Sequence, residues 1–292
     1  MKYAYYPGCS VNGAYGRGYD QSLRFTFGVL GVEFEELDDW NCCGATSYVS
    51  VDDLTSYALA ARNLALAERD HRDIVAPCAA CYLVLNKTRH YISDYPHIGH
   101  VVERALGEIG LSYTGQTQVR HPLDILLNEV GIQAIAQKVK KPLRGLQVAP
   151  YYGCQIVRPY ATFDDQRKPT SMDKLLAACG AKVVNYPEKT ECCGASQKGA
   201  LSEVGLDRIL RLLTSAHAQG AQVIATACPL CQFNLECYQE ETGNGQPPIT
   251  MPILFFTQLI ALALGASARE IGLDRSIVPV KQVLASKEIA YA

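Results

Sequence analysis

Residues 41–45 read Asn-Cys-Cys-Gly-Ala, and residues 191–195 read Glu-Cys-Cys-Gly-Ala. Each stretch belongs to a larger cysteine pattern that the chain contains twice. In both copies a lone cysteine precedes the Cys-Cys-Gly stretch and a Cys-x-x-Cys motif follows it. The ten cysteines are Cys9, Cys42, Cys43, Cys78 and Cys81 in the first copy, and Cys154, Cys192, Cys193, Cys228 and Cys231 in the second.

The spacing of the two copies is nearly the same. In both, 34 residues separate the cysteine pair from the Cys-x-x-Cys motif, and 32 or 37 residues lie between the lone cysteine and the pair. The flanks also repeat, since Tyr-Tyr-Pro-Gly-Cys at 5–9 resembles Tyr-Tyr-Gly-Cys at 151–154. Such a repeat indicates duplication. We therefore predict two domains of similar fold, 1–140 and 146–292, related by a pseudo-two-fold axis, with the linker around 138–145.

Each half alternates strand-like and helix-like segments. Apolar residues recur at helical spacing in 54–64 and 206–213, and the run 252–266 predicts a buried helix because it is too short to span a membrane. This alternation predicts an α/β protein of two Rossmann-like domains with small parallel sheets flanked by helices. The cysteines then follow the strands, where open α/β sheets bind ligands. Strands are predicted at 2–6, 32–37, 73–76, 146–151, 182–186 and 222–226.

The composition excludes several classes of protein. With 292 residues, a net charge of -2 and 48% hydrophobic residues, the chain has no basic surplus for nucleic acid or anionic membranes. It opens with no secretory signal and contains no transmembrane run, so we expect a cytoplasmic protein. In a reducing compartment, twelve cysteines favour metal binding over disulfides.

The type of metal site follows from the cysteine pairs. Thiolates select zinc, copper(I) or iron–sulfur clusters. A structural zinc ion takes four ligands, whereas each copy offers five cysteines. Adjacent side chains in extended backbone point to opposite sides, so the two Cys-Cys pairs suit a multinuclear cluster better than one ion. We therefore predict iron–sulfur ligation by all ten cysteines, with zinc binding and thiol–disulfide exchange as the alternatives.

Both intact Cys-Cys-Gly copies and the Tyr-Tyr-Pro-Gly-Cys opening resemble the B subunit of heterodisulfide reductase and its cysteine-rich CCG domain, over nearly the whole chain. Similar proteins occur in succinate dehydrogenases, glycolate oxidases and sulfur-oxidising complexes. The resemblance implies a noncubane [4Fe-4S] cluster in each five-cysteine set. It also implies that a disulfide, in methanogens that of coenzyme M and coenzyme B, is cleaved between the clusters. An iron–sulfur protein, the C subunit of that family, would deliver electrons, with the flavin-containing A subunit upstream.

Two functions from different classes remain. The first is an oxidoreductase subunit of sulfur metabolism that reduces, or reversibly forms, the disulfide of a small thiol, with each cluster supplying one electron. The second is a non-catalytic electron relay that docks on a dehydrogenase or a quinone-linked complex. The chain shows no Gly-x-Gly-x-x-Gly motif for flavin or nicotinamide, so electrons must come from a partner protein. Residues 267–292 either dock that partner or pack back on their own domain.

A few residues outside the ten cysteines are candidates for a role. Arg17, Arg158 and Lys198 follow cluster cysteines and could bind an anionic substrate, or be solvated surface charges. The Tyr-Tyr pairs could pack against the clusters or fill strand cores. The six histidines share no spacing, and none is assigned a role. Cys179 and Cys237 lie outside the repeat and are predicted to be small buried side chains.

Overall fold

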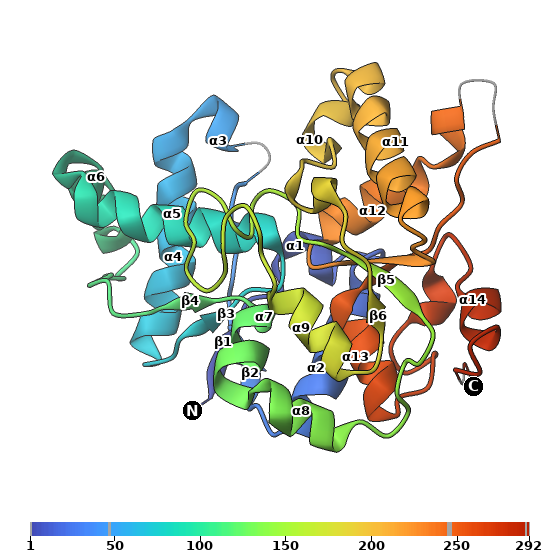
Figure 1. The fold of residues 1–292 in the computed structure, drawn as a ribbon. Coiled ribbons are helices and arrows are strands. Elements are labelled where there is room, and N and C mark those ends of the chain that lie inside the picture. Colours follow the sequence, from blue (N-terminus) through green and yellow to red (C-terminus); the bar gives the residue numbers. More distant parts are fainter. Residues whose placement is uncertain (1, 46–47, 244–246, 290, 292) are drawn as a thin grey trace.

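The computed structural model describes residues 2–45, 48–243, 247–289 and 291. Its strands form two four-stranded sheets, one in each half of the chain (Figure 1). The first half contains β1 (Tyr3–Tyr5), α1 (Gly8–Asn12), α2 (Arg17–Leu30), β2 (Phe34–Glu36), α3 (Tyr48–Val51), α4 (Asp53–Arg69), β3 (Ile74–Val75), α5 (Ala79–Asp94), α6 (Pro96–Gly107), β4 (Val119–Arg120), α7 (Pro122–Asp124), η1 (Ile125–Val130) and α8 (Ile132–Lys138). The second contains β5 (Gln147–Tyr151), α9 (Ser171–Ala178), β6 (Lys182–Val183), η2 (Pro187–Thr190), α10 (Ala195–Lys198), α11 (Ser202–Ala218), β7 (Val223–Thr226), α12 (Pro229–Cys237), η3 (Glu240–Gly243), β8 (Ile253–Phe255), α13 (Phe256–Leu264), η4 (Leu273–Arg275) and α14 (Lys281–Ala285).

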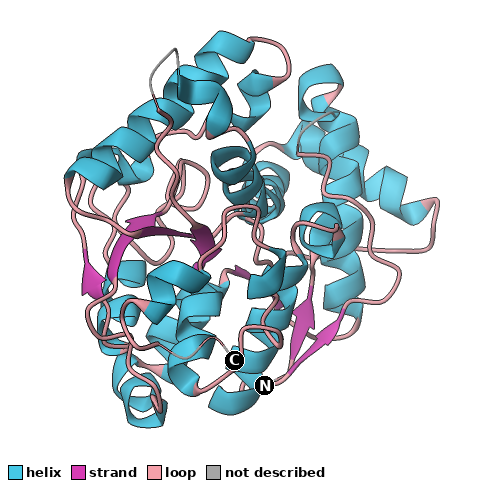
Figure 2. Ribbon diagram, turned by 90° about the vertical axis from the view of Figure 1, so that its right-hand side faces the viewer, coloured by secondary structure: helices cyan, strands magenta, loops and turns pink. Residues whose placement is uncertain are grey.

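The two sheets have the same topology. Their strand orders are β2-β1-β3-β4 and β6-β5-β7-β8, and all neighbouring strands are parallel. At the centre of the first sheet, Ala4 pairs with Glu35 on one side and Ile74 on the other. In both halves, helices flank the sheet (Figure 2). The predicted α/β class with two similar Rossmann-like halves is confirmed.

The edge strands β4 and β8 are additions to the predicted strands. β4 has two residues, too few for a periodic pattern to reveal. β8 occupies the start of the apolar run 252–266, so the expectation of a helix is wrong for 253–255 and correct for 256–264, where α13 lies. Every residue of β8 and α13 is buried, and a continuous apolar run fits either structure. No helix in the described part of the chain is long and apolar enough to cross a membrane.

Local signals account for several helix ends. The side chain of Asp52 accepts hydrogen bonds from the N–H groups of Leu54 and Thr55, which caps the first turn of α4. Gly31 ends α2 at a φ of 76°, and Gly265 ends α13 at a φ of 108°. Both are left-handed conformations that glycine adopts without strain at Cβ.

The two halves share one hydrophobic core. α2 of the first half packs against α13 of the second (Figure 1). Between these helices the buried hydroxyl oxygens of Ser22 and Thr257 are 2.6 Å apart and hydrogen-bonded. Nearby, Tyr19 stacks on Phe255 with ring centroids 4.5 Å apart. This packing fixes how the ends of the two sheets face each other.

The segment after α13 packs back on the protein. Ile271, Leu273 and Leu284 are buried in the shared core. Oε1 of Glu236, in α12, accepts a hydrogen bond from the N–H of Val278 at 3.1 Å. Of the two alternatives for residues 267–292, the described part therefore takes the packed one.

The anchor at Glu236 should make stability depend on pH. Burial raises the pKa of this carboxyl to about 7, from an ordinary value of 4.5. Because the folded pKa is raised, the stabilisation is complete below the unfolded pKa and is lost as pH rises through the folded pKa. Between about pH 4.5 and pH 7.5 we expect the unfolding free energy to fall by about 3 kcal/mol relative to Glu236→Gln.

Urea unfolding at each pH measures this difference. Glu103→Gln, on the exposed side of α6, is the matched control and should track the wild type at every pH. If the difference in unfolding free energy between the wild type and Glu236→Gln stayed constant across this pH range, the prediction would be wrong.

Candidate metal centre

Each sheet has a switch point where its strand order reverses. β2 lies on one side of β1, whereas β3 and β4 lie on the other, and β5 has the same surroundings. Open α/β sheets bind ligands at such points, beyond the carboxyl ends of the strands. Cys9 follows β1 and Cys78 follows β3, as Cys154 and Cys228 follow β5 and β7. The topology thus directs the lone cysteine and the Cys-x-x-Cys motif of each copy to one crevice.

In the first half, four of the five sulfurs form two close pairs. Sγ of Cys9 lies 3.8 Å from Sγ of Cys42, and Sγ of Cys43 lies 3.3 Å from Sγ of Cys81. Cys9 and Cys42 are exposed, whereas Cys43, Cys78 and Cys81 are buried. The adjacent cysteines 42 and 43 therefore belong to different pairs, one outer and one inner.

The second half repeats this arrangement. Sγ of Cys193 lies 3.3 Å from Sγ of Cys231, as in the first half. Cys154 and Cys192 are partly exposed, and their thiols interact. The N–H of Gly194 donates to Sγ of Cys192 at 3.3 Å, an interaction that the first Cys-Cys-Gly stretch also makes. The sequence repeat is therefore a repeat in geometry.

Glycines allow the lone cysteines to approach the inner sulfurs. Gly8 has a φ of +67°, and a Cβ there would lie 2.8 Å from Sγ of Cys81. Gly153 has a φ of +68°, and its Cβ would lie 3.5 Å from Sγ of Cys231. A side chain at Gly8 would therefore occupy space beside the buried sulfurs.

Hydrogen bonds among the thiols change their pKa values. Hydrogen bonds from Cys42 and Cys81 lower the pKa of Cys43 to about 4. The interaction with Cys154 lowers the pKa of Cys192 to about 2. In each half, therefore, the surroundings of one cysteine favour its thiolate form. Ionising a whole set would need a nearby cation, because like charges this close repel.

The two sets approach each other between the halves. Cys78 is the N-cap of α5 and Cys228 is the N-cap of α12, where the positive helix end favours a thiolate. Interactions with Cys231 and Cys78 lower the pKa of Cys228, and the interaction with Cys228 raises the pKa of Cys78. The inner cysteines of the two sets are therefore neighbours.

The donor arrangement fits a cofactor with several metal atoms. Among the described residues, no group of three or more His, Cys, Asp or Glu side chains is placed to hold a metal ion. Each half nevertheless supplies five thiols, four of them in close pairs in the first half, whereas a structural zinc ion takes four ligands. Thiolates are the ligands of iron–sulfur clusters, so the residue types present fit such a cluster better than one zinc ion.

One tyrosine in each half holds the Cys-Cys turn. The hydroxyl of Tyr6 donates to the carbonyl of Asn41 at 2.8 Å, and that of Tyr151 donates to the carbonyl of Glu191 at 2.7 Å. Asn41 and Glu191 each precede a cysteine pair. These buried tyrosines, expected to fill strand cores or to pack against a cluster, thus also position the turns that carry the cysteine pairs.

The three cationic candidates differ in their surroundings. Arg158 donates to the carbonyl of Thr190, and Lys198 forms an ion pair with Glu241 at 3.2 Å. Arg17 is exposed and lines a cavity of about 220 Å³. Arg158 and Lys198 therefore have protein partners and no evident role in binding an anion.

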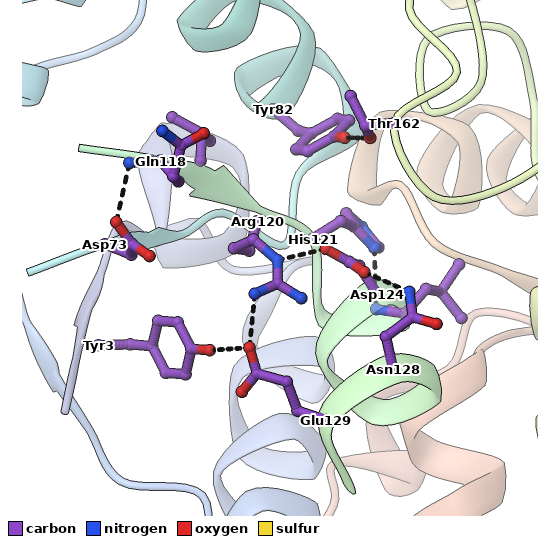
Figure 3. Close-up of polar contacts among 12 residues, drawn as sticks. Tyr3, Asp73, Tyr82, Gln118, Arg120, His121, Asp124, Asn128, Glu129 and Thr162 are labelled. Carbon is purple, nitrogen blue, oxygen red and sulfur yellow. Dashed lines mark hydrogen bonds and ion pairs between the residues drawn. The ribbon is translucent and has the colours of Figure 1, made fainter. Parts of the chain in front are cut away.

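For two cysteines and one histidine outside the two cysteine sets, the sequence predicts burial or no role, and the structure agrees for only one of the cysteines. Cys179 is buried, as expected, and burial raises the pKa of its thiol to about 12. Cys237 is exposed, so its predicted burial is wrong, because the last turn of α12 carries it on the outer side. His121, assigned no role, is fully buried between the halves (Figure 3). It follows β4, the strand that periodicity could not reveal.

Comparisons with known proteins identify the family. A family model for the cysteine-rich domain CCG matches residues 3–86 and 148–236. The 8-methylmenaquinol:fumarate reductase membrane anchor subunit of Wolinella succinogenes is 31% identical, over 95% of this chain and 97% of its own length. The B subunit of the ferredoxin:CoB-CoM heterodisulfide reductase of Methanosarcina mazei is 30% identical, over 97% of this chain and 96% of its own.

A solved structure supports the fold independently. A hypothetical protein from Helicobacter pylori superposes with a TM-score of 0.74 at 16% identity. The match covers 96% of this chain and 52% of that protein, so the chain spans about half of its length. Together with the two family matches and the near full-length relatives, the duplicated cysteine geometry shows that this chain belongs to the cysteine-rich CCG-domain family, in the group similar to the B subunit of heterodisulfide reductase.

Proposed function

We propose that the chain is the catalytic iron–sulfur component of a heterodisulfide reductase-like complex. The observation that carries the proposal is that two complete five-cysteine sets approach each other at Cys78 and Cys228. In this proposal each half, 1–140 and 146–292, holds one [4Fe-4S] cluster of the noncubane type. When bound, the two clusters supply singly the two electrons that reducing a disulfide requires.

The cysteines of each set differ in their exposure to solvent. The outer cysteines of each set, such as Cys9 and Cys42, are open to solvent or partly so. The inner cysteines are buried and form the close pairs. A small molecule that approaches either site would therefore meet the outer cysteines first.

The chain needs partners in this proposal. Its ten cluster cysteines are committed to two sets, which leaves Cys179 and Cys237, too few for a further cluster. Electrons would arrive through an iron–sulfur protein similar to the C subunit of heterodisulfide reductase and a flavin protein similar to its A subunit, in the cytoplasm. The substrate is a small thiol or disulfide, and the reaction can run in either direction.

The relay function has support of its own. The relative from Wolinella succinogenes is named as part of a quinol:fumarate reductase. If this chain resembled that protein in function, its clusters would pass electrons without binding a disulfide. The two functions differ in whether an added thiol changes the EPR signal of the clusters.

Anaerobic purification followed by iron and acid-labile sulfide analysis tests the cofactor. About eight irons per chain, with an EPR signal that changes on adding candidate thiols, is the expected result. Full iron content with a signal indifferent to every thiol would favour the relay, and zinc in place of iron would contradict both functions.

Removing one inner cysteine should abolish the reaction. Cys43→Ala and Cys193→Ala each take one sulfur from a 3.3 Å pair. We expect each variant to lose about half of its iron and all disulfide reduction. Cys179→Ala, which removes a buried cysteine outside both sets, should keep its iron and activity. Unchanged disulfide reduction in either inner-pair variant would show that the paired sets are not the active site.

A methyl group at Gly8 should block one site. Gly8→Ala places Cβ 2.8 Å from Sγ of Cys81 and adds a left-handed strain of about 1–2 kcal/mol. We expect the iron content to fall by about half, to the four irons of the second cluster. Gly28→Ala, inside α2 with no atom within 4 Å of the added Cβ, is the matched control and should keep all the iron. A fully loaded Gly8→Ala protein would contradict the crevice geometry.

Alkylation of native protein should map the ligands. Cys9, Cys42 and Cys237 are exposed, and Cys179 is buried. In the iron-loaded protein we expect iodoacetamide to modify Cys237 alone among these four, because bound sulfur is a poor nucleophile. After iron removal, Cys9 and Cys42 should react as well, and peptide mass spectrometry reads the sites. Rapid labelling of Cys9 before iron removal would exclude it as a ligand.

A further inference from the structure

One imidazole lies where the two halves meet, close to both Cys-x-x-Cys motifs. His121 has no exposed surface. Its Nε2 lies 3.0 Å from the carbonyl oxygen of Pro77, and its Nδ1 accepts the N–H of Leu123 at 3.1 Å. Because Nδ1 is an acceptor, the proton of the neutral ring is on Nε2 and is donated to Pro77. Pro77 directly precedes Cys78.

The other half meets the same ring. The carbonyl of Ala227, which directly precedes Cys228, also interacts with the imidazole of His121. The buried hydroxyl of Tyr19, in α2, donates to this carbonyl at 3.4 Å. The Tyr19 hydroxyl of the first half thus holds a carbonyl of the second half, one residue before Cys228, and His121 lies against the same carbonyl.

Aromatic rings fix the orientation of the imidazole. Tyr82 meets it edge-on with centroids 5.7 Å apart, and Phe163 of the second half lies parallel to it at 6.3 Å. The hydroxyl of Tyr82 is in turn hydrogen-bonded to Thr162, next to Phe163 (Figure 3). The ring is therefore enclosed by both halves and cannot turn its donor away from the carbonyls.

The duplication shows that this donor is specific to one half. In the first sheet Val75, three residues before Cys78, pairs with Arg120. In the second sheet Ala225, three residues before Cys228, pairs with Leu254. The next residues, His121 and Phe255, are therefore equivalent. Phe255 fills the same place with a ring that has no donor, so core packing alone does not require histidine there.

We infer that His121 is a positioning residue: its N–H holds the segment that precedes Cys78, its ring packs against the second half beside the carbonyl that Tyr19 holds, and together they set the spacing of the two cluster sites. The inference rests on the proposed function, because spacing matters only if two clusters act on one substrate. His121 itself touches no reacting atom. It acts through Pro77 and Ala227, whose positions fix the N-caps of α5 and α12.

Substitutions at His121 separate this role from simple packing. His121→Phe copies the residue of the second half and removes the donor, whereas His121→Gln keeps an N–H near the position of Nε2. Tyr19→Phe removes the second donor and keeps the stack on Phe255. In the iron-loaded chain, we expect the magnetic interaction between the two reduced clusters, measured by EPR, to weaken in His121→Phe and to be restored in His121→Gln. Tyr19→Phe should change it in the same direction, but less.

Iron content and thermal unfolding accompany each spectrum. With full iron in all variants, an interaction in His121→Phe equal to that of the wild type would overturn the inference, as would equal losses in His121→Phe and His121→Gln. A wild-type chain without iron would contradict the proposed function instead. After iron removal, the rate of Cys78–Cys228 disulfide formation under mild oxidant, mapped by mass spectrometry, measures the same spacing without the clusters. It should be several-fold slower in His121→Phe than in the wild type, and equal rates would overturn the inference.

Discussion

The whole structure depends on holding several sulfurs, each prone to negative charge, within a few ångströms of one another. In both halves an inner pair is 3.3 Å apart. Free thiolates would repel at this distance, so the backbone must hold them together. It does so with parallel strands that end at one crevice, with helices whose positive ends face the Cys-x-x-Cys motifs, and with glycines where a Cβ would intrude.

Duplication gives two sites, and the core between the halves turns them into a pair. α2 and α13 pack across the junction, and Tyr19 reaches from one half to the backbone of the other. The inner cysteines Cys78 and Cys228 become neighbours as a result. The halves are similar in strand order but differ at the junction, where His121 of the first half takes the place that Phe255 takes in the second. A phenylalanine at both positions would supply no hydrogen-bond donor at the junction of the two halves.

Each site has a solvent-exposed side and a buried side. The outer cysteines are exposed or partly exposed, and the inner cysteines are buried beside tyrosines whose hydroxyls hold the Cys-Cys turns. A charged or polar molecule can reach the outer side without removing the inner sulfurs from the low-dielectric core. The outer cysteines are therefore the ones that a substrate or a partner would meet first.

The sequence alone determined the duplicated α/β fold, the ten cysteines and their placement after strands, because side-chain periodicity and motif spacing are local properties of the chain. It could not show β4, a strand of two residues, or that the run 252–266 begins as a strand, since a buried apolar run fits either structure. It also misplaced Cys237 and gave no role to His121. Only the tertiary structure decided these, because they depend on contacts between segments far apart in the chain, and the packing of one half on the other leaves no periodic signal in either.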